Sequence, residues 1–150
     1  MCRFCDYPKM LEKVDLQPTP KRLKILEIIG GNDKPLSAQD IFKTINRTDG
    51  INRVTVYRIL DLLVENGLAE RISTGGRSFN YGMAPNDHHS PHPHFYCTRC
   101  GGMECLNPES LTVDPVPLLR MFPGRIDSVE VRVDGICGNC LRTDRPSAGN

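Results

Sequence analysis

The chain contains 150 residues, and its 19 lysines and arginines against 18 aspartates and glutamates give a net charge of +1. This length accommodates one domain or two small ones, and a small domain has difficulty stabilising itself by apolar burial alone. Because the sequence shows neither a secretory leader nor an apolar run long enough to cross a bilayer, we expect a cytoplasmic protein with no membrane partner.

The charge is distributed unevenly along the chain. Residues 1–82 carry 13 lysines and arginines against 10 acidic residues, whereas residues 83–150 carry 6 against 8. A mildly basic half is by itself weak evidence for nucleic-acid binding. We predict two structural units, joined near residues 82–91.

Three helices are predicted in the first unit. Thr19 and Pro20 supply a side-chain cap and a first-turn proline, and the helix that they begin ends at Gly30. A second helix begins at Ser37, which opens a pattern resembling a capping box, and runs to about Asn46.

The third helix is predicted to begin after the capping residue Asn52 and to stop at Gly67. One face is apolar at helical spacing and is predicted to be buried; it comprises Val56, Ile59, Leu60 and Leu63. The exposed face carries positive and hydrogen-bonding groups in its first two turns, namely Arg53, Thr55, Tyr57 and Arg58. Such a helix is suited to enter a major groove by its N-terminal end.

Two strand-like segments, 68–73 and 78–81, follow this helix. They flank a turn whose glycines allow positive φ and whose Arg77 can contact a phosphate. Three helices followed by a hairpin predict a winged helix. The alternative is a helical bundle with a solvated, charged face.

The second unit contains two cysteine pairs, Cys97 with Cys100 and Cys137 with Cys140, each separated by two residues. This spacing lets both sulfurs of a pair bind one tetrahedral zinc at about 2.3 Å. Four protein ligands leave no open position for water or substrate, so we predict a structural zinc. The alternatives are two disulfides or four buried thiols, and a reducing compartment disfavours the disulfides.

All four histidines lie shortly before the first cysteine pair. In an extended segment His92 and His94 point to one side, because side chains alternate with a period of two, and they can therefore share an ion. The alternative is a solvated linker. Further strands are expected at 95–97, 103–106 and 126–134, and prolines limit any helix between them to about 116–121.

The motifs of the chain, taken in order, resemble those of the ferric uptake regulator (Fur) family. They are Thr19-Pro-Lys-Arg-Leu-Lys-Ile-Leu26, Ser37-Ala-Gln-Asp-Ile41, Arg53-Val-Thr-Val-Tyr-Arg58, His92-Pro-His-Phe-Tyr-Cys97 and Gly135-Ile-Cys137-Gly-Asn-Cys140. The resemblance runs from about Thr19 to Leu141. It implies a dimeric, metal-dependent transcriptional repressor that binds a double-stranded DNA operator, not an enzyme, with no small-molecule substrate.

The resemblance also implies an α+β architecture. We expect a winged-helix DNA-binding domain with an N-terminal extension at 1–82, and a hinge at 83–91. A small α/β dimerisation and metal-binding domain with the four-cysteine zinc site is expected at 92–141, followed by a tail at 142–150.

By this resemblance Tyr57 contacts a thymine methyl group and Arg58 the DNA backbone, while Arg53 and Thr55 contact phosphates or bases. Tyr57 has the alternative of being a packed core residue. The family often places a lysine just before the first capped helix, where this chain has none. Lys13 is the candidate substitute; otherwise the contact is absent.

The resemblance places regulatory metal ligands at His92, His94 and the position of Cys105. Asp87, His88 or His89 would supply a further ligand. Three other family ligands are missing: the histidine before the Ser37 helix, the hinge-strand carboxylate or cysteine near Gly82, and any histidine after His94. Cys105 has the alternative of being a small buried apolar residue.

Nitrogen and thiolate ligands favour Zn²⁺, so zinc sensing is the leading hypothesis. Sensing of Fe²⁺, Mn²⁺ or Ni²⁺, or of peroxide, is the alternative within the family. A zinc-binding carrier or interaction module without DNA binding is the alternative from another class. A zinc hydrolase or deaminase would need an open zinc and an H-x-E motif, which is absent.

A third pair with the same spacing, Cys2 and Cys5, lies at the N-terminus. We expect this segment to be disordered, with metal binding and a thiol switch as alternatives.

Overall fold

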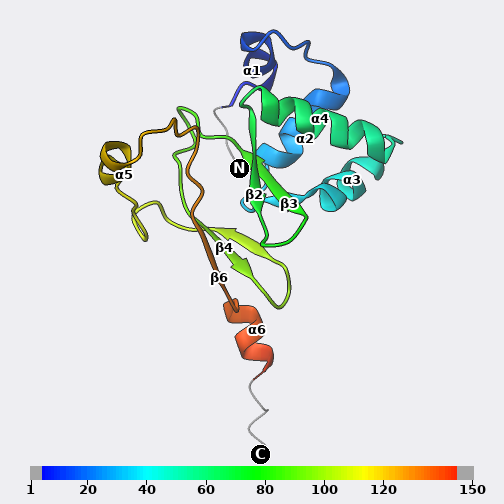
Figure 1. Cartoon of the computed structure of the whole chain (residues 1–150). Coiled ribbons are helices and arrows are strands. Elements are labelled where there is room, and N and C mark those ends of the chain that lie inside the picture. The colour runs from blue at the N-terminus through cyan, green and yellow to red at the C-terminus, as the bar shows by residue number, and fades with distance from the viewer. Residues whose placement is uncertain (1–4, 145–150) are drawn as a thin grey trace, which may run out of the picture. The chain divides into compact units, whose positions relative to one another are not determined.

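A computed structural model describes residues 5–144 of the chain (Figure 1). The chain divides into two compact units, Met1–Pro91 and His92–Asn150. Residues 83–91, the expected hinge, fall within the first unit. Among the described residues, no helix has the length and apolar character needed to span a membrane.

The first unit contains the helices α1 (Tyr7–Lys13), α2 (Pro20–Gly30), α3 (Ala38–Asn46) and α4 (Arg53–Glu65). The three predicted helices, α2 to α4, are confirmed together with their caps. Thr19 accepts a hydrogen bond from the amide of Arg22, and the Asn52 side chain accepts one from the amide of Thr55 at 2.8 Å. Ser37 accepts one from the amide of Asp40 at 3.1 Å.

Helix α1 was not predicted, although it carries a recognisable start signal. The side chain of Asp6 accepts a hydrogen bond from the amide of Lys9 at 3.1 Å, which caps the helix. Leu11 is fully buried, and the ring of Tyr7 lies directly over Gly30, where a β-carbon would collide with it. Helix α1 is therefore packed firmly against the end of α2.

A three-stranded antiparallel sheet completes the first unit, in the order β1 (Leu36–Ser37), β3 (Phe79–Met83), β2 (Ala69–Ser73). The β2–β3 hairpin is the predicted wing, and its turn contains Gly75 at a φ of 80°. Strand β1 was missed because its two residues are too few to show a periodicity. Helices and hairpin together form a winged helix.

The four α4 residues predicted to be buried are all in the core. The core cluster joins this face of α4 to α1, α2, α3 and the sheet. Its fully buried members are Leu11, Ile25, Leu26, Ile41, Ile45, Val56, Leu60 and Leu63. The first unit thus has a continuous apolar core of its own.

The second unit has a three-stranded sheet with β4 (His94–Cys97) at its centre. Strand β5 (Met103–Cys105) pairs with β4 antiparallel, and β6 (Arg132–Gly135) pairs with it parallel. Helix α5 (Val116–Met121) is confirmed as predicted, whereas α6 (Gly138–Thr143) was not predicted.

The expected strand at 126–134 is wrong in its first part, because only Arg132–Gly135 is a strand. The ladder of β6 with β4 starts where His94 pairs with Arg132. The residue before His94 is Pro93, which has no N–H to donate and cannot extend the ladder. The alternation of valines therefore predicted a longer strand than the structure contains.

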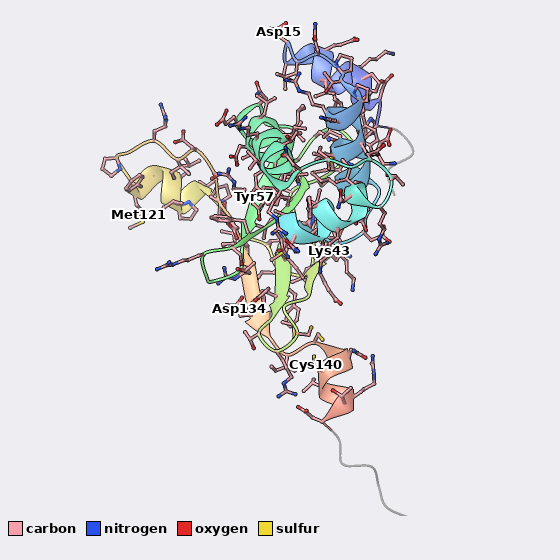
Figure 2. All side chains as sticks on the ribbon, turned by 90° about the vertical axis from the view of Figure 1, so that its right-hand side faces the viewer. Asp15, Lys43, Tyr57, Met121, Asp134 and Cys140 are labelled. Carbon is pink, nitrogen blue, oxygen red and sulfur yellow. The ribbon has the colours of Figure 1, made fainter. Side chains whose placement is uncertain are left out.

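The second unit has a thin core. Of the hydrophobic residues between 92 and 144, the buried ones are Cys97, Met103 and Cys140. Large apolar side chains on and around α5 are exposed, including Leu119 at 62% and Met121 at 84% (Figure 2). This unit therefore depends on contacts other than apolar burial within one chain.

We predict that Leu63→Ala lowers the free energy of unfolding of the first unit by about 2–5 kcal/mol, because it leaves a cavity in a closed core. Leu63 is 0% exposed, whereas Val54 on the same helix is 57% exposed. Val54→Ala is the matched control and should change stability by less than about 0.5 kcal/mol. Denaturant unfolding measures both, and equal losses would contradict the core assignment.

Candidate metal centres and nucleic-acid interface

The four predicted cysteine ligands lie together at one end of the second unit. Their sulfurs lie within 4.8 Å of one another, and they gather beside the start of α6 (Figure 2). The Sγ atoms of Cys97 and Cys140 are 3.9 Å apart, as are those of Cys100 and Cys137. A disulfide requires about 2.05 Å, so these four residues are free thiols and not two disulfides.

These distances fit a tetrahedral zinc. Four sulfurs at about 2.3 Å from one ion are about 3.8 Å from each other, close to the separation seen here. Cys97 ends β4, and Cys137 caps α6, so the two pairs come from elements at the same end of the sheet. Helix α6 begins directly after Cys137 because the side chain of Cys137 accepts a hydrogen bond from the amide of Cys140 and so caps the helix.

Backbone amides donate hydrogen bonds to a cysteine sulfur of this cluster and favour its thiolate form, which is the form that binds a metal cation. The N–H groups of Cys137 and Cys100 donate to the sulfur of Cys97 at 3.3 and 3.5 Å. These bonds lower the pKa of Cys97 to about 6, since they stabilise its thiolate. The pKa of Cys140 is raised to about 12 by the thiol of Cys137, by burial and by the other sulfurs. Only a cation would let all four sulfurs ionise together.

A second cluster contains His92, His94 and Cys105, whose ligand atoms also lie within 4.8 Å of one another. His94 in β4 is paired directly with Cys105 in β5, and the rings of His92 and His94 have centroids 4.6 Å apart. The strand pairing therefore brings together three residues that the sequence predicted as ligands. This donor set of two nitrogens and one sulfur fits a divalent cation of the zinc class.

His94 is suited to act as a ligand at neutral pH. It is 4% exposed, and its pKa is lowered to about 4 by burial first and then by the neighbouring His92, while Glu130 opposes this shift. The imidazole is therefore neutral at pH 7 and offers a lone pair. Cys105 is exposed at the edge strand, so its alternative assignment as a buried apolar residue is wrong.

The remaining candidate ligands belong to the first unit. Asp87, His88 and His89 follow β3, in a turn where the backbone amide of His88 donates to the Asn86 side chain at 2.8 Å. Asp87 and His88 are exposed, and His89 is half-buried. Which of the three joins the second cluster stays a prediction.

Cys5 does not behave as predicted. It lies just before α1, and its Sγ is 3.5 Å from Nε2 of His89, so the expectation of disorder is wrong for this residue. Cys2 lies outside the described residues.

The predicted DNA-contacting face of α4 is exposed. Tyr57 is 41% exposed, so its alternative assignment as a packed core residue is wrong, and Arg58 is exposed beside it. Thr55 is half-buried near the start of the helix. Arg53 places its guanidinium over the ring of Phe42 in α3, 4.9 Å from the ring centroid. This contact orients Arg53 at the N-terminal end of α4.

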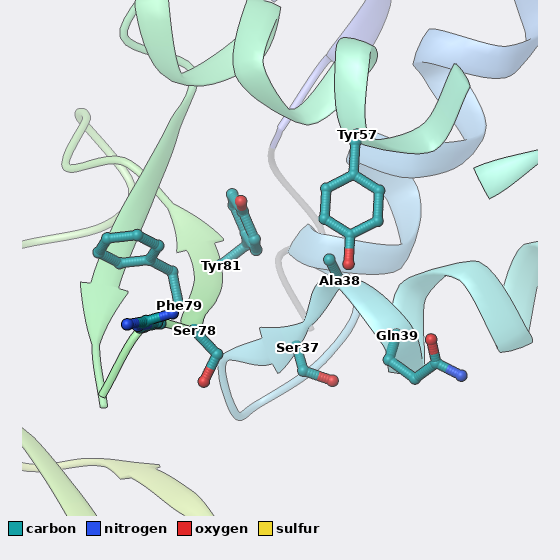
Figure 3. Close-up of a pocket in the computed structure, with 8 residues that line it drawn as sticks. Ser37, Ala38, Gln39, Tyr57, Ser78, Phe79 and Tyr81 are labelled. Carbon is teal, nitrogen blue, oxygen red and sulfur yellow. The ribbon is translucent and has the colours of Figure 1, made fainter. Parts of the chain in front are cut away.

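A cleft of about 380 Å³ lies between the start of α3, the side chain of Tyr57 and the wing. Tyr57 extends from α4 toward Ala38, and Phe79 on β3 lies on the opposite side of the cleft (Figure 3). Arg77 and Gln39 add polar groups to its lining. The positions of Phe42, Phe79 and Gln39 beside these residues were not predicted, because they depend on how α3 packs against α4 and the wing.

The two outlying basic candidates are both exposed. Arg77 is in the wing turn, where Thr74 donates a hydrogen bond to the carbonyl of Ser78 at 2.9 Å and closes the turn. Lys13 is the last residue of α1. Both side chains are accessible to a phosphate.

Comparison with known proteins shows the family to which this chain belongs. Residues 13–114, more than half of the chain, match the ferric uptake regulator family. This chain belongs to the ferric uptake regulator family. A ferric uptake regulation protein of Bordetella parapertussis is 30% identical over 88% of this chain and 94% of that protein. A relative of the same description from Klebsiella pneumoniae is 28% identical over 91% of this chain and 89% of that protein.

Solved structures of Fur-family regulators share the fold. The Helicobacter pylori regulator, described as having three functional metal binding sites, matches with a TM-score of 0.69 at 19% identity over 94% of this chain and 97% of its own. A zinc uptake regulator solved with zinc and DNA matches with a TM-score of 0.65 at 22% identity, covering 90% of each chain.

Fur-family proteins are metal-responsive transcriptional repressors that bind DNA operators and function as dimers. This chain is therefore a metal-responsive transcriptional regulator and not an enzyme. Its α+β fold with a cysteine cluster in the second unit agrees with the sequence-based prediction.

We predict that Cys97→Ser removes the one zinc per chain that resists a chelator, because Cys97 supplies the sulfur with two amide donors. The second unit should unfold with it. Metal analysis after dialysis and thermal unfolding measure both effects. Cys105→Ala is the control and should keep the chelator-resistant ion; full retention of that ion by Cys97→Ser would contradict the assignment.

Proposed function

We propose that this Fur-family protein is a zinc-responsive repressor whose regulatory cation is held by His92, His94 and Cys105. The observation that carries this proposal is the convergence of these three side chains across the β4–β5 pair. Asp87, His88 or His89 would supply the further ligand. The four-cysteine cluster would hold a separate, structural Zn²⁺.

The donor set supports zinc over the other metals of the family. Fe²⁺ and Mn²⁺ prefer more oxygen ligands and higher coordination, whereas imidazole and thiolate in a four-coordinate site suit Zn²⁺. The position in β5 opposite His94 holds the thiol Cys105 and not a carboxylate. Fe²⁺, Mn²⁺ and Ni²⁺ are the competing occupants that a binding experiment must compare.

DNA recognition is assigned to the N-terminal end of α4 and the cleft beside it. Tyr57 presents an aromatic edge that can pack on a thymine methyl, and Arg58 a guanidinium suited to a phosphate. Arg53, held over Phe42, and Thr55 are further contacts of this helix. Arg77 on the wing and Lys13 on α1 would bind flanking phosphates.

A homodimer is the proposed assembly, acting on a palindromic operator in the cytoplasm. The exposed apolar side chains of the second unit, including Leu118, Leu119 and Phe122, give it a surface to bury against a second copy. Two copies of α4 would then read half-sites about 34 Å apart, one turn of DNA.

The regulatory step concerns the connection between the two units. His92 is the first residue of the second unit and stands between Pro91 and Pro93, whose rings restrict the backbone on either side. When bound, the cation would supply the positive charge that holds His92 to His94 and Cys105. With His92 fixed, the connection between the two units would adopt fewer conformations. The two copies of α4 in a dimer would then sample a narrower range of spacings.

We predict that Tyr57→Ala and Arg58→Ala each weaken operator binding about 5- to 150-fold, the equivalent of about 1–3 kcal/mol for a direct DNA contact. Neither variant should lose zinc, because neither residue is a member of the two metal clusters. Arg125→Ala, at an exposed arginine outside α5 and outside the DNA-contacting helix, makes the same charge change and should bind DNA normally. Operator binding is measured by an electrophoretic mobility assay. Unchanged binding by both α4 variants would contradict the assignment of this helix to DNA recognition.

We predict that zinc raises wild-type operator affinity about 5- to 150-fold, the usual range for one allosteric coupling, and that His94→Ala and Cys105→Ser abolish this rise. Glu104→Gln is the control, since Glu104 neighbours Cys105 on β5 but lies outside the cluster.

Operator binding at buffered free zinc, iron(II), manganese(II) and nickel(II) measures this response. Equal operator affinity with and without metal would contradict metal regulation. A response to iron(II) at lower free concentration than zinc would contradict the choice of metal. No operator binding at any metal level would favour a metal carrier.

A further inference from the structure

Phe79 presents an exposed apolar ring on the wing. It is the first residue of β3 and is 42% exposed, although its ring has no polar atom that could bond to water. Together with Tyr57 and Tyr81 it lines the cleft of about 380 Å³, so the ring belongs to a concave, aromatic wall. Such a wall is typical of a binding site. Phe79 is not among the DNA contacts proposed above.

The ring of Phe79 is held in place by its neighbours. Antiparallel pairing sets Ser73 of β2 directly opposite Phe79 and places Arg71 diagonally from it on the same face. The guanidinium of Arg71 lies over the ring, 5.8 Å from its centroid, and forms an ion pair with Asp61 of α4. The ring is thus connected to α4 as well as to its own hairpin, and a partner that binds it has little left to order.

The polar groups of the cleft match a sugar–phosphate strand. Arg77 in the wing turn adds a positive charge to the lining, and Gln39 near the start of α3 adds an amide. None of the described residues that line the cleft is acidic. Guanidinium and amide donors suit phosphate oxygens, and aromatic rings suit the carbon surface of the deoxyribose between two phosphates. The cleft therefore fits one strand of a DNA duplex.

The cleft also lies where such a strand has to pass. Tyr57, which is assigned to a thymine methyl in the major groove, extends into the cleft from α4, and Phe79 lies on the opposite side (Figure 3). A helix in the major groove has the sugar–phosphate backbone of one strand beside it. With α4 in this groove, the backbone that borders the groove runs between Tyr57 and the wing.

We propose that Phe79 is a further DNA-contacting residue, whose ring packs on a deoxyribose of the operator strand that occupies the cleft. The inference rests on the DNA recognition by α4 proposed above, and it adds a contact that recognises the sugar. The C2′ edge of deoxyribose is apolar, whereas a ribose places its 2′-hydroxyl against the ring with no hydrogen-bond partner. Phe79 therefore favours DNA over RNA, and it contributes equally to operator and non-operator DNA.

The test measures DNA affinity of the full-length protein by fluorescence anisotropy, at the metal concentration that gives the tightest wild-type binding. Phe79→Ala should bind the operator and a scrambled duplex about 5- to 10-fold more weakly, by the same factor for both, because it exposes less apolar surface to the sugar. Phe79→Leu keeps an apolar side chain and should regain most of this loss. Ser73→Ala, directly opposite in the hairpin, is the control and should bind as the wild type does.

The salt dependence separates the sugar contact from a phosphate contact. Phe79→Ala should keep the wild-type slope of log affinity against log salt, because it removes no charge. Arg77→Ala should reduce this slope by about 1. A reduced slope in Phe79→Ala would contradict an apolar contact.

Single ribonucleotides, placed in turn along one half-site, locate the sugar. At one position the wild type should lose affinity and Phe79→Ala should not, which is the coupling that a double-mutant cycle measures. Identical ribonucleotide profiles for the two proteins would overturn the inference, as would a loss of affinity confined to the operator, which would indicate a base contact.

Far-ultraviolet circular dichroism establishes that each variant is folded before its affinity is measured. Wild-type affinity in Phe79→Ala, together with weakened binding by Tyr57→Ala, would overturn this inference and leave the proposed function standing. A wild-type protein that binds no DNA at any metal level would overturn both.

Discussion

The sulfur cluster that joins the end of β4 to the start of α6 is the constraint on which the second unit depends. A unit of this size normally gains its stability by burying apolar side chains, yet the buried hydrophobic residues described between 92 and 144 include two of the cluster's own cysteines. The apolar side chains around α5 face outward instead. A metal bound by the cysteine cluster and burial of this surface against a second copy, both proposed above, would each add stability.

The two proposed metal sites lie at opposite ends of one strand. Cys97 is the last residue of β4 and His94 is the first, so the strand that ends in the four-cysteine cluster begins in the cluster of His92, His94 and Cys105. Pairing with β5 then sets Cys105 opposite His94. A metal bound by the four cysteines at one end of β4 would therefore hold in place the strand that carries the proposed regulatory site at the other end. The first unit needs no such support, because α1 to α4 close around an apolar core.

Much of this arrangement could be predicted from the sequence, because the signals were local. The caps Thr19, Ser37 and Asn52 gave the starts of three helices, and the two-residue spacing of the cysteines gave the sulfur cluster. The alternation of His92 and His94 indicated a shared site for the same reason. Each of these features depends on residues within one turn or one strand.

The predictions that were wrong or missing concern features that depend on residues far apart in the sequence. The strand expected at 126–134 is shortened because its partner β4 is preceded by Pro93, which the valine alternation does not reveal. Helix α6 begins at Gly138 because Cys137, a member of the cysteine cluster, caps it. The cleft beside Tyr57 and the contact of Cys5 with His89 depend on tertiary packing alone.

Amide hydrogen exchange before and after complete removal of zinc tests most directly whether the sulfur cluster maintains the second unit. The amide of Thr98, which bonds to the carbonyl of Gly135 at 2.8 Å, reports on the junction of β4 and β6. Loss of protection there and along β4, while the amides of α2 to α4 stay protected, is the result that we predict. Unchanged protection of β4 and β6 in the zinc-free protein would contradict the account.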